Sequence, residues 1–176
     1  ATVERILERF SVDRAQAARV AATAKRFYEE LLPAASEEMK KRLAWACLLH
    51  EVGFTISHSD YHKHSAYLVQ HADLAGFSPS DQERIAQLVL GQRGNLKKVY
   101  EALEDRERSA KILALRLAVI LNHARRDVEL PRWSLKFGRA IEFGLDSDWL
   151  LRHPLTHYLL VEEAMHWARV GIASSV

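Results

Sequence analysis

The sequence has few of the residues that break or cross-link a chain: its 176 residues include seven glycines, four prolines and one cysteine. No glycine-rich phosphate loop of the P-loop or Rossmann type is present. The single cysteine, Cys47, lies in an apolar run, so no disulfide can form within the chain, and we expect a cytoplasmic protein. Nucleotide-binding folds built on those loops and disulfide-stabilised secreted domains are therefore excluded.

The sequence also lacks a long hydrophobic run and a strong net charge. Its longest apolar run, residues 112–121, is interrupted by Arg116 and is too short to span a bilayer. The formal charge of +2 is too small to indicate nucleic-acid binding by itself. With 48% hydrophobic and 27% charged residues, the composition is that of a folded globular protein, and we expect neither a membrane nor a nucleic acid as partner.

Apolar residues recur at helical spacing through most of residues 1–127 and are bounded by capping residues. Ser11 or Asp13, Ser36 and Ser78 precede helical segments as N-caps. Gly53 is expected to end the helix that begins after Ser36. The pattern predicts helices over about residues 3–10, 13–31, 37–50, 61–72, 79–90, 96–103 and 108–126.

After Pro131 the pattern changes. Residues 133–137 and 140–143 alternate with a period of two on either side of Gly138, which predicts a β-hairpin. A helical pattern begins again at Pro154. We therefore predict a mainly α protein, with an all-helical domain over residues 1–127 and a small α+β extension over residues 128–176 packed on it.

Four of the nine histidines fall within one stretch of fifteen residues, beside two carboxylates. His50 and Glu51 end a helical run, and His58, His62 and His64 follow before and within the next helix. Histidine and carboxylate at helix ends suit a metal site, whereas histidine and lysine at a helix N-terminus suit a phosphate site. These residue types alone leave both alternatives open.

The segments WACLLHEVG, HKHSAYLVQHADLAGF, LALRLAVILNHAR and HPLTHYLLVEEAMHWARVG resemble the helical domain of the exopolyphosphatase and guanosine pentaphosphate phosphohydrolase family. That domain is a degenerate relative of the metal-dependent HD phosphohydrolases, so the resemblance implies an HD-like helical bundle. In the family, actin-fold catalytic domains precede the helical domain, and nothing in this sequence resembles them. The resemblance implies a C-terminal part of a longer phosphoric anhydride hydrolase, with the catalytic residues and any Mg²⁺ in the other domains.

The resemblance also bears on metal binding by this chain. HD enzymes use a histidine on an early helix, a His-Asp pair after the next helix, and a distant aspartate. Here the pair is His50-Glu51, residues 15–31 contain no histidine, and residues 117–121 are all apolar where the aspartate would fall. We expect no metal and no catalytic role, with His50 and Glu51 tying helix ends together. An autonomous HD-type metal-dependent phosphohydrolase acting on a nucleotide is the alternative.

Arg116 needs a partner because its helix is apolar on nearly every face, and an unpaired buried charge costs several kcal/mol. We expect a salt bridge to Glu51, with Glu142 and Glu162 as alternative partners. Direct contact with an anionic ligand is the other interpretation of this residue.

A second set of basic residues surrounds the start of the helix near Tyr61 and the turn that contains Gly91 and Gly94. We predict that they line a groove for inorganic polyphosphate or guanosine pentaphosphate, which leads toward the catalytic domains of the same protein. The predicted phosphate-binding residues are His58, His62, Lys63, His64, Arg93, Lys97 and Lys98. A purely structural domain, or one that forms a homodimer, is the third alternative.

Overall fold

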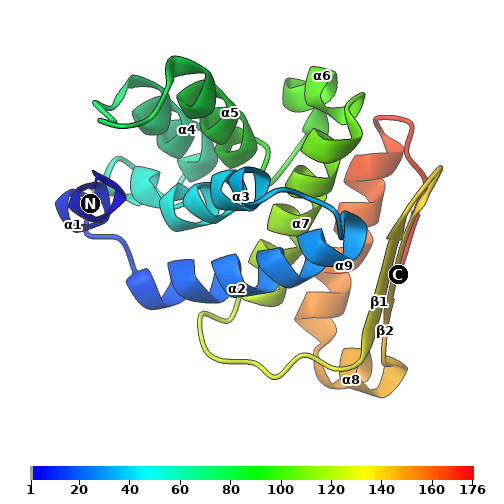
Figure 1. Ribbon diagram of the computed structural model, residues 1–176. Coiled ribbons are helices and arrows are strands. Elements are labelled where there is room, and N and C mark those ends of the chain that lie inside the picture. Colours follow the sequence, from blue (N-terminus) through cyan, green and yellow to red (C-terminus); the bar gives the residue numbers. More distant parts are fainter. Residues whose placement is uncertain (1) are drawn as a thin grey trace.

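The computed structural model describes residues 2–176, which form a bundle of helices with a small sheet along one side (Figure 1). The helices are α1 (Thr2–Arg9), α2 (Arg14–Leu31), α3 (Glu37–Leu49), α4 (Tyr61–His71), α5 (Pro79–Leu90), α6 (Tyr100–Leu103), α7 (Arg106–Leu121), α8 (Ser147–Arg152) and α9 (Pro154–Ala168), with 3-10 helices η1 (Val52–Thr55) and η2 (Leu96–Val99). The strands are β1 (Trp133–Phe137), β2 (Ile141–Leu145) and β3 (Ser174–Ser175). The prediction of a mainly α protein with a small α+β extension is confirmed.

Side-chain caps fix where the helices begin. The carboxylate of Asp13, and not Ser11, caps α2 by accepting a hydrogen bond from the Gln16 amide at 3.0 Å, while Ser11 adopts a φ of 50° in the turn after α1. Ser36 and Ser78 cap α3 and α5 as predicted. Each such bond satisfies one of the amide groups that a helix leaves unpaired in its first turn.

Helix α7 is shifted from its predicted position. It begins two residues earlier, because Asp105 accepts a hydrogen bond from the Arg108 amide at 2.9 Å. It ends at Leu121 and not at residue 126, because Asn122 donates its side-chain amide to the Ala118 carbonyl, and Arg125 takes a φ of 57°. The end of the apolar run, and not the charged residues after it, thus marks the end of the helix.

Gly53 does not end α3, which stops at Leu49, and this prediction was wrong. Gly53 lies within η1, where its amide donates to the Ser65 hydroxyl at 2.8 Å. A Cβ at this position would lie 2.5 Å from the Ser65 nitrogen and 2.6 Å from the Tyr61 carbonyl oxygen. Glycine is required here because η1 passes directly against α4.

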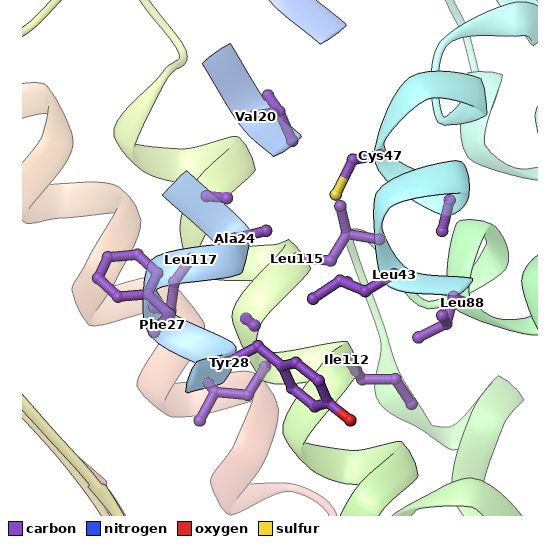
Figure 2. Close-up of a cluster of buried hydrophobic side chains, with 14 of the residues drawn as sticks. Val20, Ala24, Phe27, Tyr28, Leu43, Cys47, Leu88, Ile112, Leu115 and Leu117 are labelled. Carbon is purple, nitrogen blue, oxygen red and sulfur yellow. The ribbon is translucent and has the colours of Figure 1, made fainter. Parts of the chain in front are cut away.

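The core is continuous from the helices into the C-terminal segment. Helix α2 packs on α3 and α7, and Figure 2 shows Ala24 of α2, Leu43 of α3 and Leu115 of α7 gathered between these helices. The ring of Phe27 also meets Trp133 at 4.9 Å and Phe143 at 5.4 Å between centroids, both edge to face. Burial of these rings fastens the hairpin onto α2. The domain boundary at residue 127 stays a prediction, since one core serves both segments.

The hairpin is confirmed, with Phe137 of β1 opposite Ile141 of β2. The sequence pattern did not reveal α8 or β3, which pairs parallel to β2 through Ile141 and Ser174. Helix α9 packs along α7 and thereby faces the helical part of the molecule (Figure 1). Across residues 2–176, none of the helices combines the length and the apolar character that crossing a membrane requires.

Candidate functional site

His50 and Glu51 lie side by side in a buried position where α3 ends. The His50 ring is 1% exposed, and its Nδ1 lies 2.5 Å from the Cys47 carbonyl oxygen. Burial lowers the pKa of His50 below its ordinary value, which favours the neutral ring. Glu51 accepts two hydrogen bonds from the guanidinium of Arg125, at 2.7 and 3.0 Å. These bonds raise the pKa of Arg125, which also reaches Asp13 at 3.1 Å.

This arrangement does not suit a divalent metal. Both oxygens of Glu51 are occupied by a cation, and the Nε2 atom of His50 lies 3.9 Å from the nearer one. In the part of the chain that the structure describes, no group of three or more histidine, cysteine, aspartate or glutamate side chains could hold a metal ion. Arg125 instead links the end of α3 to the start of α2, the kind of connection between helix ends expected for His50 and Glu51.

Arg116 is buried at 1% exposure, as expected, but its predicted partner was wrong. Its Nε and Nη2 donate to the two oxygens of Glu163 on α9, at 2.7 and 2.9 Å. The same guanidinium donates to the carbonyls of Gly91 and Gly94, both at 2.9 Å. Neither Glu51, which pairs with Arg125, nor Glu142 or Glu162 takes this role, because α9 packs with Glu163 facing α7.

The buried pair forms the centre of a larger network. Trp167 donates its indole N–H to Glu163 at 2.7 Å, so the carboxylate holds three donors. The two glycine carbonyls belong to the turn after α5, which carries Arg93 and leads into η2, where Lys97 and Lys98 lie. Arg116 thus fixes that turn against α7 and α9, and all three of its guanidinium nitrogens are bonded to these partners.

Four predicted phosphate ligands come together at the first turn of α4, the turn before η2 and η2 itself. We call Lys63, Arg93 and Lys98 the basic cluster, and His62 lies beside them. The ammonium of Lys98 donates to the Arg93 carbonyl at 2.5 Å. Burial, followed by the charges of Arg116, Lys63 and Arg93, lowers the pKa of Lys98 to about 8. The carboxylate of Asp60 opposes this effect.

His62 belongs to this region but not to its surface. It is 6% exposed and shares the buried face of α4 with Ser65, Ala66 and Val69. Burial, then the charges of Lys98 and Arg93, lowers the pKa of His62 to about 4. The neutral imidazole therefore cannot contribute the positive charge that the sequence pattern suggested near neutral pH.

The remaining predicted ligands lie farther out. The ring of His58 is exposed and packs on Phe54, with 4.4 Å between centroids. Phe54 in turn meets Tyr61, over which the guanidinium of Arg93 lies at 5.3 Å from the ring centroid. Among residues 2–176, the side chains of His64 and Lys97 form no hydrogen bond or ion pair with the basic cluster. Their membership in a phosphate groove stays a prediction.

A pocket of about 260 Å³ opens between α7, α9 and the turn after α5. Val119, Ile120 and Leu159 supply apolar lining, and Tyr61 and Arg93 lie at the end that adjoins the basic cluster. The pocket is also lined by Gln92, Gly94, Arg116, His123, Glu162, Glu163 and His166. The pocket and the basic cluster therefore share Arg93 and form one continuous surface.

Sequence reasoning missed three residues that shape this region. Arg125 binds Glu51. Its sequence signal is its place just after the apolar helix α7, which ends near the acidic end of α3. Gln92 is buried and donates to the carbonyls of His50 and Val89, at 2.8 and 3.0 Å. Tyr61 was recognised only as a helix start, although an aromatic ring among basic residues is a signal of stacking.

Comparison with known proteins bears on the family. The family described as Ppx/GppA phosphatase, domain III, matches residues 1–164. A guanosine-5'-triphosphate,3'-diphosphate pyrophosphatase of Pseudoalteromonas translucida (strain TAC 125) is 32% identical over 177 residues, which cover 97% of this chain and 36% of that protein. The chain thus spans little more than a third of that relative's length. The predicted resemblance to the exopolyphosphatase and guanosine pentaphosphate phosphohydrolase family is confirmed. The chain, which the family matches over nearly all of its length, therefore belongs to the Ppx/GppA phosphatase family, of which it is domain III.

Proposed function

We propose that this chain is the part of a hydrolase that binds the phosphate groups of inorganic polyphosphate or guanosine pentaphosphate. It does not cleave them itself. The observation that carries the proposal is the basic cluster, whose three cations form no ion pair within residues 2–176. Grouped like charges repel one another, so a bound phosphate would relieve their repulsion.

The titration of Lys98 supports this function. A lysine whose pKa is lowered to about 8 by burial and by neighbouring cations holds its proton less firmly than an ordinary lysine. A phosphate placed against the cluster would supply the missing negative charge and raise that pKa. Binding of the anion and protonation of Lys98 therefore favour each other.

The engagement of Glu51 by Arg125 supports the non-catalytic part of the proposal, because a carboxylate paired with a guanidinium at both oxygens is a poorer metal ligand and a weaker base. The chain is incubated with polyphosphate or nucleotides and Mg²⁺ or Mn²⁺, and released phosphate is measured. We expect none. Metal-dependent release that is abolished by His50→Ala, together with stoichiometric metal in the purified chain, would instead establish the HD-type phosphohydrolase.

The binding part is tested by titrating long-chain polyphosphate into the chain at two salt concentrations. We expect affinity to fall steeply with salt, as for other phosphate polymers, and to fall about tenfold or more in a Lys63→Ala, Arg93→Ala double variant. A Lys136→Ala, Arg139→Ala variant on the hairpin removes the same charge from two exposed positions away from α4 and should bind normally. Equal affinities in the two variants would refute a local phosphate site.

A second candidate function is a packing surface, favoured by one observation. Helices α8 and α9 expose a row of large apolar side chains at helical spacing: Leu151, Leu155, Tyr158, Val161 and Met165. Because the chain spans only 36% of its relative's length, we assign this row to contact with other parts of the same protein.

Light scattering on the chain and stability measurements on the longer protein test this second function. We expect the chain to be monomeric and Val161→Glu to lower the stability of the longer protein only. A dimer of the chain that Val161→Glu dissociates would instead assign the row to a homodimer.

A further inference from the structure

The pocket between α7 and α9 adjoins the basic cluster, and beside its arginine and histidine side chains part of its lining is apolar. Apolar side chains of Val119, Ile120 and Leu159 line it, and phosphate gains nothing from such contacts. At about 260 Å³ it lies at the lower end of small-molecule sites, which run from roughly 300 to 1,000 Å³. Its size and its apolar lining suit a flat ring system of modest size.

The groups at the boundary between pocket and cluster suit a planar ligand. Arg93 lies over Tyr61 with 5.3 Å between the guanidinium carbon and the ring centroid, so a planar cation and an aromatic ring border the pocket together. Nucleobases stack on both kinds of group. Because Arg93 also belongs to the basic cluster, a base in the pocket would have its phosphates directed onto Lys63 and Lys98.

One carboxylate in the pocket indicates which base. Glu163 is engaged by Arg116 and Trp167, whereas Glu162 lines the same pocket and forms no ion pair within residues 2–176. The Tyr158 hydroxyl hydrogen-bonds to Glu162, and one such bond leaves acceptor sites of the carboxylate for a ligand. A carboxylate offers acceptors only. Guanine presents two neighbouring donors, its ring N1–H and its exocyclic amino group, and so pairs with a carboxylate through two bonds. Adenine presents an acceptor at N1, which a carboxylate would repel.

We propose that this pocket receives the guanine base of a guanosine polyphosphate whose phosphate groups lie on the basic cluster, with Glu162 reading the base and Tyr61 and Arg93 stacking near it. The proposal rests on the proposed phosphate-binding function and adds a nucleoside subsite to it. The domain would then distinguish a guanosine polyphosphate from an inorganic phosphate chain of the same length.

The test compares three ligands with equal numbers of phosphates: GTP, ATP and inorganic tripolyphosphate, titrated into the chain by calorimetry. We expect GTP to bind about tenfold more tightly than either of the others, the contribution of one well-held base. Glu162→Gln keeps the size of the side chain but gives it a donor, and should abolish the preference for GTP over ATP. Ile120→Trp and Leu159→Trp, which fill the pocket from α7 and from α9, should reduce GTP affinity to that of tripolyphosphate.

The outcomes separate the inference from the proposed function. Equal affinities for all three ligands, with salt-dependent binding of long-chain polyphosphate retained, would overturn the guanine pocket and leave the phosphate site in place. A preference for GTP that survives Glu162→Gln and both tryptophan variants would also overturn it. Loss of all binding in Lys98→Ala, with tripolyphosphate binding retained in Glu162→Gln, would support both.

Discussion

Arg116→Ala is the sharpest test of how the C-terminal helix is held. The substitution removes four hydrogen bonds at once: two to Glu163 and one each to the carbonyls of Gly91 and Gly94. It leaves Glu163, 5% exposed, with the indole of Trp167 as its remaining donor. The stranded carboxylate, and not the lost attraction, dominates the expected loss.

The magnitude follows from the burial of both partners. Removing one partner of a buried ion pair costs about 3–5 kcal/mol, because the other charge remains desolvated. For a domain of this length each kcal/mol lowers the midpoint of thermal unfolding by roughly 2–4 °C, so Arg116→Ala should lower it by roughly 6–20 °C. Arg116→Met should cost less than alanine, because it restores most of the buried volume.

A double-mutant cycle measured by thermal and urea unfolding separates charge from packing. Combining Arg116→Met with Glu163→Gln removes both charges and keeps an acceptor for the Trp167 indole. We expect the pair to be more stable than Arg116→Met alone. Arg126→Ala, an exposed arginine just beyond α7, is the control and should change stability little. A loss below about 1 kcal/mol for Arg116→Ala would refute the stranded-charge argument.

Three further predictions concern pH and close packing. Polyphosphate affinity should rise as pH falls through about 8, where Lys98 gains its proton, and Lys98→Met should flatten this dependence in titrations between pH 9 and 7. His62, with a pKa of about 4 against about 6.5 in an unfolded chain, binds fewer protons when folded, so stability should fall as pH drops from about 6.5 to 4. His62→Gln should weaken that fall in pH-dependent melting curves, and identical slopes would contradict it. Gly53→Ala should cost about 1–3 kcal/mol, because its Cβ meets the Ser65 nitrogen at 2.5 Å, whereas Gly138→Ala meets nothing within 4 Å and serves as the control in urea unfolding.

Local sequence patterns were enough to predict most of the helices. A helix is closed by hydrogen bonds four residues apart, and its start is fixed by a neighbouring side chain, so Ser36 and Ser78 could be identified without the fold. The hairpin was equally local, with two alternating runs on either side of Gly138. The short elements α8 and β3 escaped because six residues and two residues carry too little periodicity.

The sequence also identified the family and the neighbourhood of the basic cluster. Lys63, Arg93 and Lys98 were named because a helix start and a glycine-bounded turn each carried cations, and the fold brings these two segments together. The continuity of this cluster with an apolar pocket could not be predicted. That pocket forms only where α9 returns along α7, more than thirty residues later in the chain.

What the tertiary structure alone decided was the direction in which each side chain points. Glu162 and Glu163 are neighbours in sequence, yet one residue turns a helix by about 100°, so Glu163 faces Arg116 and Glu162 faces the pocket. The same rotation buries His62 and exposes Lys63 on α4. The sequence by itself determined which residues share a helix and which family the chain resembles. The packing of α9 on α7, and of η1 on α4, determined which charges are paired and which remain available to a ligand.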